Sequence, residues 1–275
     1  MNGLKIRKMT PVIGAEIFGV DLAEPLGNQT FQAVHDALMD NLVVFFRDQV
    51  MDEAQQKAFG RRFGALHIHP AAPSVEGHPE VMVIHADANS TFVNGESWHS
   101  DVSCEAEPPM GSVLYMRTLP DVGGDTLFAN MYAAFEALSS PMRRMLEGLT
   151  ATHDGEGLYR GRYGTDDRAR TYPRADHPVV RTHPVTGRQA LFVNSFFTTR
   201  IKEVSKPESD ALLAFLFHHV ETPEFSCRFR WAPNSVAFWD NRSAQHHAIW
   251  DYFPHTRSGT RVTIKGDRPF YRAAA

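Results

Sequence analysis

The sequence predicts a mainly β fold, with its strands arranged as a double-sheet jelly roll and a few helices inserted between them. Short apolar runs of strand length recur along the chain, separated by turns rich in Gly, Pro and Asn. Helical spacing of apolar residues is confined to a few stretches. At 275 residues and 43% hydrophobic content the chain is long enough for a full core, so we expect a single domain over residues 1–275.

The first half of the chain is expected to alternate strands with helices. In order, these are one or two strands within 12–22, a helix with Asn28 as its cap, a strand over 42–46, a helix capped by Asp52, and strands over 81–85 and 112–116. Residues 42–46 are continuously apolar, so we expect this strand to be buried on both faces.

The second half is expected to end in strands that follow several helices. In order, these are helices over 131–138 and 141–149 with Ser140 capping the second, hairpin strands over 178–183 and 190–194, a helix opened by a capping box at 205–208, and strands over 225–231, 235–239 and 261–265. Residues 155–176 carry almost no aliphatic side chains and are expected to form a structureless lid, with Tyr159 toward substrate. The alternative is a surface loop without contacts.

Charge and cysteine content exclude several classes of partner. The net charge of -4 argues against a nucleic-acid or anionic-membrane surface, because both need a basic footprint. Cys104 and Cys227 lack ligand spacing and fit a reducing compartment, and the chain shows neither a signal peptide nor a membrane span. We therefore expect a cytoplasmic protein that binds neither nucleic acid nor membrane. We also expect a homo-oligomer.

One short motif indicates chemistry. His99 and Asp101 are two residues apart, so on a strand they would point to the same face. His246 is the best candidate for a third ligand, and two histidines with one carboxylate suit a non-heme Fe(II) oxygenase. Alone, the pair could be a chance feature of a surface strand. The arginines Arg257 and Arg261 follow His246, and an arginine near the metal would bind an anionic co-substrate through two parallel hydrogen bonds.

These residues, together with several spaced runs, resemble the Fe(II)/2-oxoglutarate-dependent dioxygenases of the taurine dioxygenase (TauD/TfdA) family. The runs that carry the resemblance are 14–17, 43–49, 98–101, 123–126, 239–242, 246, 257 and 266–271, so it extends over nearly the whole chain. The resemblance implies a double-stranded β-helix, which agrees with the predicted jelly roll.

The resemblance also implies the reactants. Fe(II) would be held by His99, Asp101 and His246, where the family's spacing selects His246 over its neighbour His247. 2-Oxoglutarate would be the co-substrate, with its far carboxylate bound by Thr126 and Arg257, and O2 the oxidant. The implied reaction hydroxylates a C–H bond of a small anionic organic substrate and releases succinate and CO2.

Substrate residues follow from the same resemblance: His69, Asn94, Gly95, Tyr159, Phe197 and Arg261. From the residues alone, His69 could equally lie at a solvated strand end, Phe197 in the core, and Arg261 in a surface salt bridge. Ala72 and Gly95 stand where the taurine enzyme has a tyrosine and an asparagine, which implies a larger and less polar pocket. We therefore expect weak activity on taurine and better activity on a larger sulfonate, sulfate ester or carboxylate.

Two other classes of function use the same ligand set. A zinc-dependent hydrolase could bind zinc through His99, Asp101 and His246, but Arg257 would then have no role. A non-catalytic cupin-like protein could bind metal and ligand without turnover.

Overall fold

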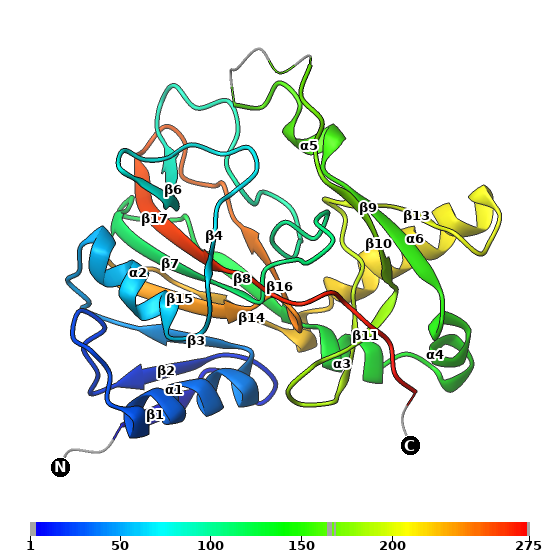
Figure 1. Cartoon of the computed structure of the whole chain (residues 1–275), viewed down its shortest axis with the longest axis horizontal. Helices are drawn as coiled ribbons and strands as arrows, with labels where there is room; N and C mark the ends of the chain where they lie inside the picture. Colours follow the sequence, from blue (N-terminus) through cyan, green and yellow to red (C-terminus); the bar gives the residue numbers. More distant parts are fainter. Residues whose placement is uncertain (1–3, 164–166, 168, 274–275) are drawn as a thin grey trace.

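A large sheet forms one wall of the structure. In this computed structural model, which describes residues 4–163, 167 and 169–273, nine strands form the sheet in the order β1-β2-β3-β15-β7-β17-β6-β5, with β4 paired to β17 (Figure 1). The strands are β1 (Lys5–Lys8), β2 (Ala15–Phe18), β3 (Val43–Phe46), β4 (Leu66–His67), β5 (Ser74–Val75), β6 (His78–Ala86), β7 (Gly111–Thr118), β15 (Ser235–Asp240) and β17 (Arg257–Ile264). Strand β3 is buried along its whole length, as the sequence predicts.

A smaller sheet packs against the large one. Its strands run in the order β14-β8-β16, with bounds β14 (Ser226–Phe229), β8 (Thr126–Asn130) and β16 (Ala244–Ala248). Phe45 of β3 stacks on Phe229, with ring centroids 3.9 Å apart, and meets Phe128 edge-on at 5.5 Å. These aromatic contacts join the two sheets face to face across the core. The predicted double-sheet jelly roll is therefore confirmed.

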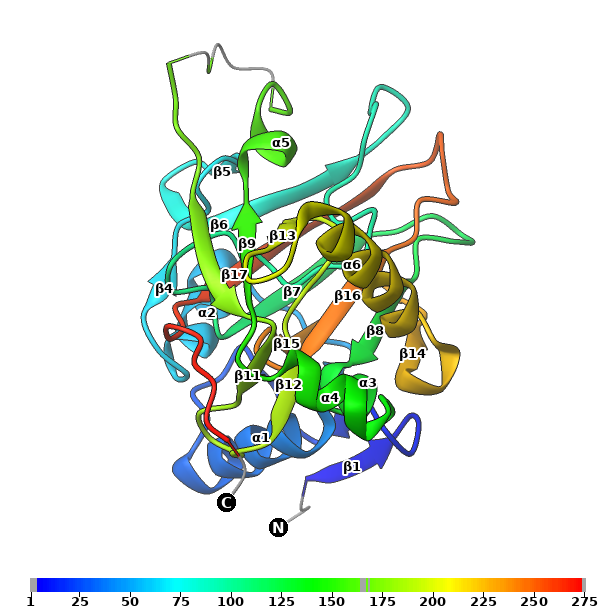
Figure 2. The ribbon, with the colours of Figure 1, turned by 90° about the vertical axis from the view of Figure 1, so that its right-hand side faces the viewer.

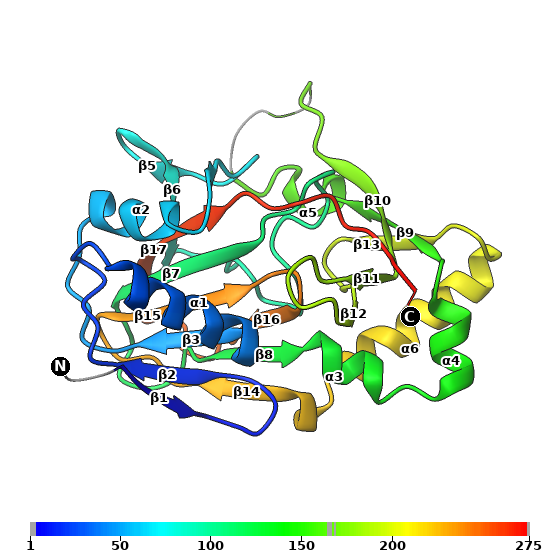
Figure 3. The same ribbon diagram turned by 60° about the horizontal axis from the view of Figure 1, so that its bottom comes forward.

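Two helices cover the outer face of the large sheet, α1 (Asn28–Asn41) and α2 (Glu53–Arg61) (Figure 3). Leu38 and Phe59 pack with Phe46 and Phe238 in one buried cluster. Helix α2 begins with the predicted cap, Asp52. Helix α1 begins one residue earlier than predicted, because Gly27 is the cap and the Asn28 side chain instead accepts a hydrogen bond from Arg62.

The opposite end of the molecule holds the remaining elements. They are α3 (Met131–Glu136), α4 (Ser140–Leu146), β9 (Thr150–Asp154), α5 (Glu156–Tyr159), β10 (Arg174–Pro178), the hairpin β11 (Val180–Thr182) and β12 (Gln189–Leu191), β13 (Thr198–Ile201), α6 (Lys206–Val220) and the 3-10 turn η1 (Pro223–Phe225). Helix α6 opens with the predicted capping box and packs on β13 (Figure 2). Ser139 caps α4, so the predicted cap at Ser140 is wrong by one residue. Across the part of the chain that is described, no helix has the length and apolar character to cross a membrane.

Residues 155–176 contain more regular structure than the sequence predicts. Helix α5 lies inside this segment, and β10 begins at Arg174 and pairs with β9. The expectation of a structureless connection is wrong for these parts, because the backbone at Asp176 pairs with Thr152 and the Asp176 carboxylate accepts the Thr152 hydroxyl at 2.6 Å. Residues 164–166 and 168 of this segment lie outside the described residues.

The backbone of β17 passes unusually close to β7 at Gly259. A Cβ at this position would lie 2.1 Å from the Tyr115 carbonyl oxygen and 2.8 Å from the Met116 sulfur. We therefore expect Gly259→Ala to lower the free energy of unfolding by about 1–3 kcal/mol, measured by chemical denaturation. Gly157→Ala, inside α5, is the control, since a Cβ there meets nothing within 4 Å. Equal midpoints for the two variants would contradict the close approach.

Candidate metal centre and anion sites

Two histidines are brought together by their own backbones. The His99 N–H donates to the His246 carbonyl at 3.1 Å, and the His246 N–H donates back to His99 at 2.9 Å. This isolated antiparallel bridge joins the segment before β7 to β16 and leaves the two imidazole centroids 4.1 Å apart. The prediction of a strand through Asp101 is wrong, because the chain turns there and Val102 has a φ of 48°. The turn, not the strand alternation, directs Asp101 toward the histidines.

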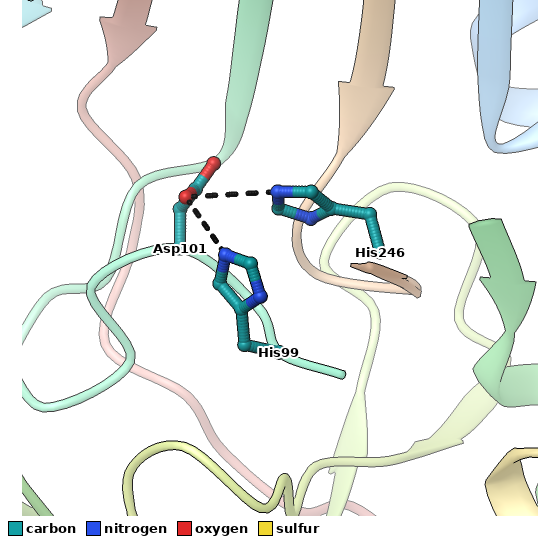
Figure 4. Close-up of side chains that lie close together, drawn as sticks. All are labelled: His99, Asp101 and His246. Carbon is teal, nitrogen blue, oxygen red and sulfur yellow. Dashed lines mark ion pairs between the residues drawn. The ribbon is translucent and has the colours of Figure 1, made fainter. Parts of the chain in front are cut away.

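The three side chains converge on one point (Figure 4). Oδ1 of Asp101 lies 3.5 Å from Nε2 of His99 and 3.9 Å from Nε2 of His246, and one ligand atom from each residue lies within 4.8 Å of the others. The Nδ1 of His99 is 2.8 Å from the Ser97 carbonyl, so it carries the proton and leaves the Nε2 lone pair toward the cluster. All three residues are buried. This donor set fits a divalent metal such as Fe(II).

The charges in this cluster favour metal binding. Burial alone would raise the pKa of the Asp101 carboxyl, but the adjacent Arg261 guanidinium holds that pKa well below its usual range. Burial, aided by neighbouring His99, lowers the pKa of His246 well below its usual value. Asp101 is therefore ionised and His246 neutral at physiological pH, and these are the protonation states in which both side chains bind metals. The rival His247 faces the Trp98 ring instead, with centroids 5.7 Å apart.

Ser112 and Asn241 fix the orientation of the Asp101 carboxylate. The Ser112 hydroxyl donates to Oδ2 of Asp101 at 2.7 Å, which leaves Oδ1 toward the histidines. The Asn241 side chain in turn donates to Ser112 at 3.3 Å and accepts the Asp101 backbone N–H at 3.2 Å. Trp239 holds Asn241 through an indole hydrogen bond of 2.9 Å. This chain of contacts occupies Oδ2 and turns Oδ1, which also accepts a hydrogen bond from Arg261, toward the histidines.

A second site is built around a buried cation, Arg257. Its Nε donates to the Gly124 carbonyl at 3.0 Å, while its Nη2 is buried without a hydrogen-bond partner. Among the described residues, no carboxylate lies within ion-pair distance of Arg257. A buried guanidinium needs an anion to offset its loss of hydration, so the arrangement indicates a place for a ligand carboxylate. Thr126 lies two residues after Gly124 and is buried as well.

The substrate residues expected from the sequence lie around one pocket. His69, Asn94, Gly95, Tyr159, Phe197 and Arg261 line it together with His99 and Asp101, whereas Thr126 and Arg257 lie outside its lining. The rest of the wall is largely apolar or aromatic and includes Met82, Val102, Leu158, Tyr163 and Phe196. Arg261 is not in a surface salt bridge: it is buried and donates to Oδ1 of Asp101 at 2.6 Å, with its Nε unpartnered.

His69 presents a defined hydrogen-bond donor. Its Nδ1 accepts the backbone N–H groups of Ala71 at 3.1 Å and Ala72 at 2.9 Å, so the ring proton must be on Nε2. Burial, followed by the neighbouring charge of Arg261, lowers the pKa of His69 to about 3. The imidazole is therefore neutral across the physiological range. His67, by contrast, pairs with Glu105 at 2.8 Å and does not line the pocket.

Several contacts of these sites were not assigned from the sequence. Ser112 lies in a run that predicted only a strand, and Tyr163 lies in the predicted lid. Asn241 and Trp231 belong to the runs 239–242 and 225–231, in which neither residue was given a role. Their partners are far away in the chain, so no local spacing identifies them. The sole sequence signal was the run 239–242, in which Asn241 lies between β15 of the large sheet and the third ligand on β16.

Comparison with known proteins agrees with this geometry. The sequence model of the family described as "Taurine catabolism dioxygenase TauD, TfdA family" matches residues 5–263. An alpha-ketoglutarate-dependent sulfate ester dioxygenase of Pseudomonas putida is 35% identical, over 97% of this chain and 91% of the relative. An alkylsulfatase of Acinetobacter baylyi is 34% identical, over 96% and 86%. The crystal structure of a taurine dioxygenase from Burkholderia xenovorans superposes with a TM-score of 0.85 at 36% identity, covering 97% of this chain and 92% of that one.

The contact between Ser112 and Asp101 generates a prediction for metal binding. Ser112→Ala removes the hydrogen bond to Oδ2 and lets the carboxylate rotate, so the Kd for Mn(II), measured by calorimetry, should rise about 10–100-fold. Ser209→Ala is the matched control, because Ser209 is also a buried serine and its hydroxyl accepts only a backbone N–H, that of Ile201, at 2.8 Å. The same Kd in both variants would show that Ser112 does not orient the carboxylate.

Proposed function

The chain belongs to the taurine dioxygenase (TauD/TfdA) family and is a 2-oxoglutarate-dependent dioxygenase, and we propose that its substrate is an organic sulfate or sulfonate larger and less polar than taurine. One observation carries the dioxygenase assignment at the site. Three buried metal-ligand atoms converge on one point, and the same fold contains a buried guanidinium without an anion, that of Arg257. A zinc hydrolase would leave that guanidinium unexplained.

We assign the metal to His99, Asp101 and His246. When bound there, Fe(II) supplies the coupling of O2 reduction to the decarboxylation of 2-oxoglutarate. The protein contributes geometry: the backbone bridge holds the two imidazoles, and Ser112 leaves one oxygen of Asp101 toward them. The burial of all three side chains excludes water from their ligand atoms.

We assign the far carboxylate of 2-oxoglutarate to Arg257 and Thr126. The free Nη2 of Arg257 can donate a charge-assisted hydrogen bond, and the Thr126 hydroxyl can donate a second. Thr126 precedes Phe128 by two residues on β8, so both side chains lie on the face that carries the Phe128 ring toward His246. The co-substrate would therefore extend from the metal ligands along β8 to the guanidinium.

The head group of the substrate is assigned to His69 and Arg261. His69 offers an Nε2 proton without needing to be charged, and Arg261 has an Nε donor with no partner. Together they present donors to the several oxygens of a sulfate or sulfonate. The relatives act on such groups, since one is named a sulfate ester dioxygenase and another an alkylsulfatase.

The body of the substrate is assigned to the apolar side of the pocket. Tyr159 and Phe197 belong to one apolar cluster with Leu158, Tyr163 and Phe196 against it. Gly95 leaves the pocket without a side chain beside the metal ligands, and a Cβ there would lie 3.0 Å from Cε1 of His99. These walls carry no carboxylate to pair with a charged amine, and they favour an alkyl or aryl group.

We propose that residues 1–275 form a single domain. We also propose that the described parts of residues 155–176 are a lid over the mouth of this pocket. Arg162 donates to Glu96 at 2.9 Å and to the Val93 carbonyl at 2.8 Å, and the Tyr163 hydroxyl donates to Asn94 at 3.0 Å. These contacts fasten the segment after α5 to the loop that precedes the metal motif. The buried free thiols of Cys104 and Cys227 support a reducing compartment. The cytoplasmic location and the homo-oligomer stay predictions.

A chain-length series tests the substrate assignment. We expect hexanesulfonate or hexyl sulfate to be oxidised with at least tenfold higher kcat/KM than taurine, because each buried CH2 contributes about 0.8 kcal/mol and the amine of taurine finds no carboxylate in the apolar wall. The measurement is substrate-dependent succinate release with 2-oxoglutarate and Fe(II).

Ethanesulfonate separates size from charge in this series, because it matches taurine in carbon number and lacks the amine. Similar turnover of taurine and hexanesulfonate would refute the enlarged apolar pocket. If no sulfonate, sulfate ester or carboxylate stimulates succinate release, the proposed function itself is wrong.

The buried cation generates a second prediction. Arg257→Ala should raise the Kd for 2-oxoglutarate at least about 30-fold, because a charged hydrogen bond of about 2 kcal/mol is lost, while the Kd for Mn(II) changes less than about threefold. Arg257→Lys keeps the charge and should give an intermediate value. If metal and 2-oxoglutarate binding weaken equally in Arg257→Ala, the arginine is structural. Calorimetry with each ligand separates the two outcomes.

A further inference from the structure

We propose that Trp231 is a positioning residue for 2-oxoglutarate, because its indole N–H fixes the direction in which the Thr126 hydroxyl donates. This inference rests on the proposed binding of the far carboxylate by Thr126 and Arg257. Nε1 of Trp231 lies 2.9 Å from Oγ1 of Thr126, and both residues are buried. The contact joins the end of one strand of the small sheet to the start of another.

The chemistry of the two groups decides which one donates. An indole nitrogen is only a donor, so the Thr126 oxygen must accept this hydrogen bond. The hydroxyl then keeps its own proton for a different acceptor, and no such acceptor is found for Thr126 among the described residues. With one lone pair engaged by Trp231, the remaining O–H is held available as a donor. A carboxylate is the ligand that such a group recognises.

The same indole also contacts the cation. The Arg257 guanidinium lies over the Trp231 ring, with its carbon 5.6 Å from the ring centroid. The edge of one side chain therefore orients the threonine donor while its face packs against the arginine donor. The two groups assigned to the far carboxylate share a single support. Arg257 is held independently by the Gly124 carbonyl, so the loss of the indole N–H alone should not displace it.

The core fixes Trp231 in turn. Phe229 pairs with Thr126 in the register of β14 and β8, which brings Trp231, two residues further along, beside the threonine. The Phe229 ring meets the indole edge-on at 4.9 Å and stacks on Phe45 of the large sheet at 3.9 Å. Packing of Phe45 on Phe229, and of Phe229 on Trp231, therefore holds the indole that contacts the Thr126 hydroxyl.

A purely structural role for Trp231 predicts something different. A buried indole needs some hydrogen-bond partner, and Thr126 could serve only that need. In that case the loss of the N–H would change stability, and any effect on 2-oxoglutarate binding would be independent of the Thr126 hydroxyl. Coupling between the two residues in ligand affinity distinguishes the roles.

The test is a double-mutant cycle on 2-oxoglutarate affinity, with Mn(II) in place of iron, O2 excluded, and Kd measured by calorimetry. Trp231→Phe removes the N–H and keeps an aromatic face for Arg257, and it should raise the Kd about 3–10-fold. Thr126→Val should raise it by at least as much. In the Thr126→Val background, Trp231→Phe should change the Kd less than about twofold, because there is no hydroxyl left to orient.

Controls keep the cycle interpretable. The Kd for Mn(II) should stay within about twofold in all four proteins, and Trp250→Phe, at a half-buried tryptophan that packs against Phe253, should leave both Kd values unchanged. Independent effects of the two substitutions, or an unchanged Kd in Trp231→Phe, would overturn the inference. Absence of 2-oxoglutarate binding to the unmodified protein would instead overturn the proposed function.

A second variant tests the same inference if Trp231→Phe does not fold. A benzothienyl analogue of tryptophan at position 231 has sulfur in place of the N–H and keeps the size and shape of the indole. The same rise in Kd is expected with the fold retained, and an unchanged Kd in this protein would also overturn the inference.

Discussion

The pair of backbone hydrogen bonds between His99 and His246 is the constraint on which the site depends. It joins a turn-forming segment near the middle of the chain to a strand near its end, and no side chain has to form it. Because the bonds are made by the main chain, the two backbones that carry the imidazoles keep their separation whether or not anything is bound between the rings. Asp101 then needs only one further restraint, which Ser112 provides from β7 and Asn241 from the turn between β15 and β16.

Charge is balanced differently in the two halves of the site. Arg261 is paired with Asp101, so that cation and carboxylate offset each other's loss of hydration. Arg257 has no such partner among the described residues and is supported by a backbone carbonyl and the Trp231 face. A buried cation left in this state costs stability until an anion arrives. In the proposed function, the far carboxylate of 2-oxoglutarate is the anion that offsets this cost.

Residue spacing and hydrophobic periodicity predicted most of the strands and helices and the overall fold. The buried strand predicted over 42–46 is observed over 43–46, and the cap at Asp52, the capping box at Ser205 and the jelly roll were confirmed. Helix caps at Asn28 and Ser140 were each misplaced by one residue, because Gly27 caps the first helix without a side chain and the Ser139 hydroxyl caps the second by accepting the Met142 N–H. The predicted strand through Asp101 was wrong, because a turn and not strand alternation brings the Asp101 side chain to His99 and His246. Contacts such as Trp231 with Thr126 join residues 105 positions apart, and only tertiary structure brings them together.

Rigid and adaptable parts of the site are built from different elements. The proposed metal and co-substrate residues lie on paired strands or beside them, where hydrogen bonds to a neighbouring backbone fix their positions. The proposed substrate residues Asn94, Tyr159 and Phe197 come from a loop, a short helix and a turn that meet over the pocket. Changes in these connections alter the shape of the pocket without moving the metal ligands. Selection for a different substrate body can therefore act on these connections while the oxidative chemistry is retained.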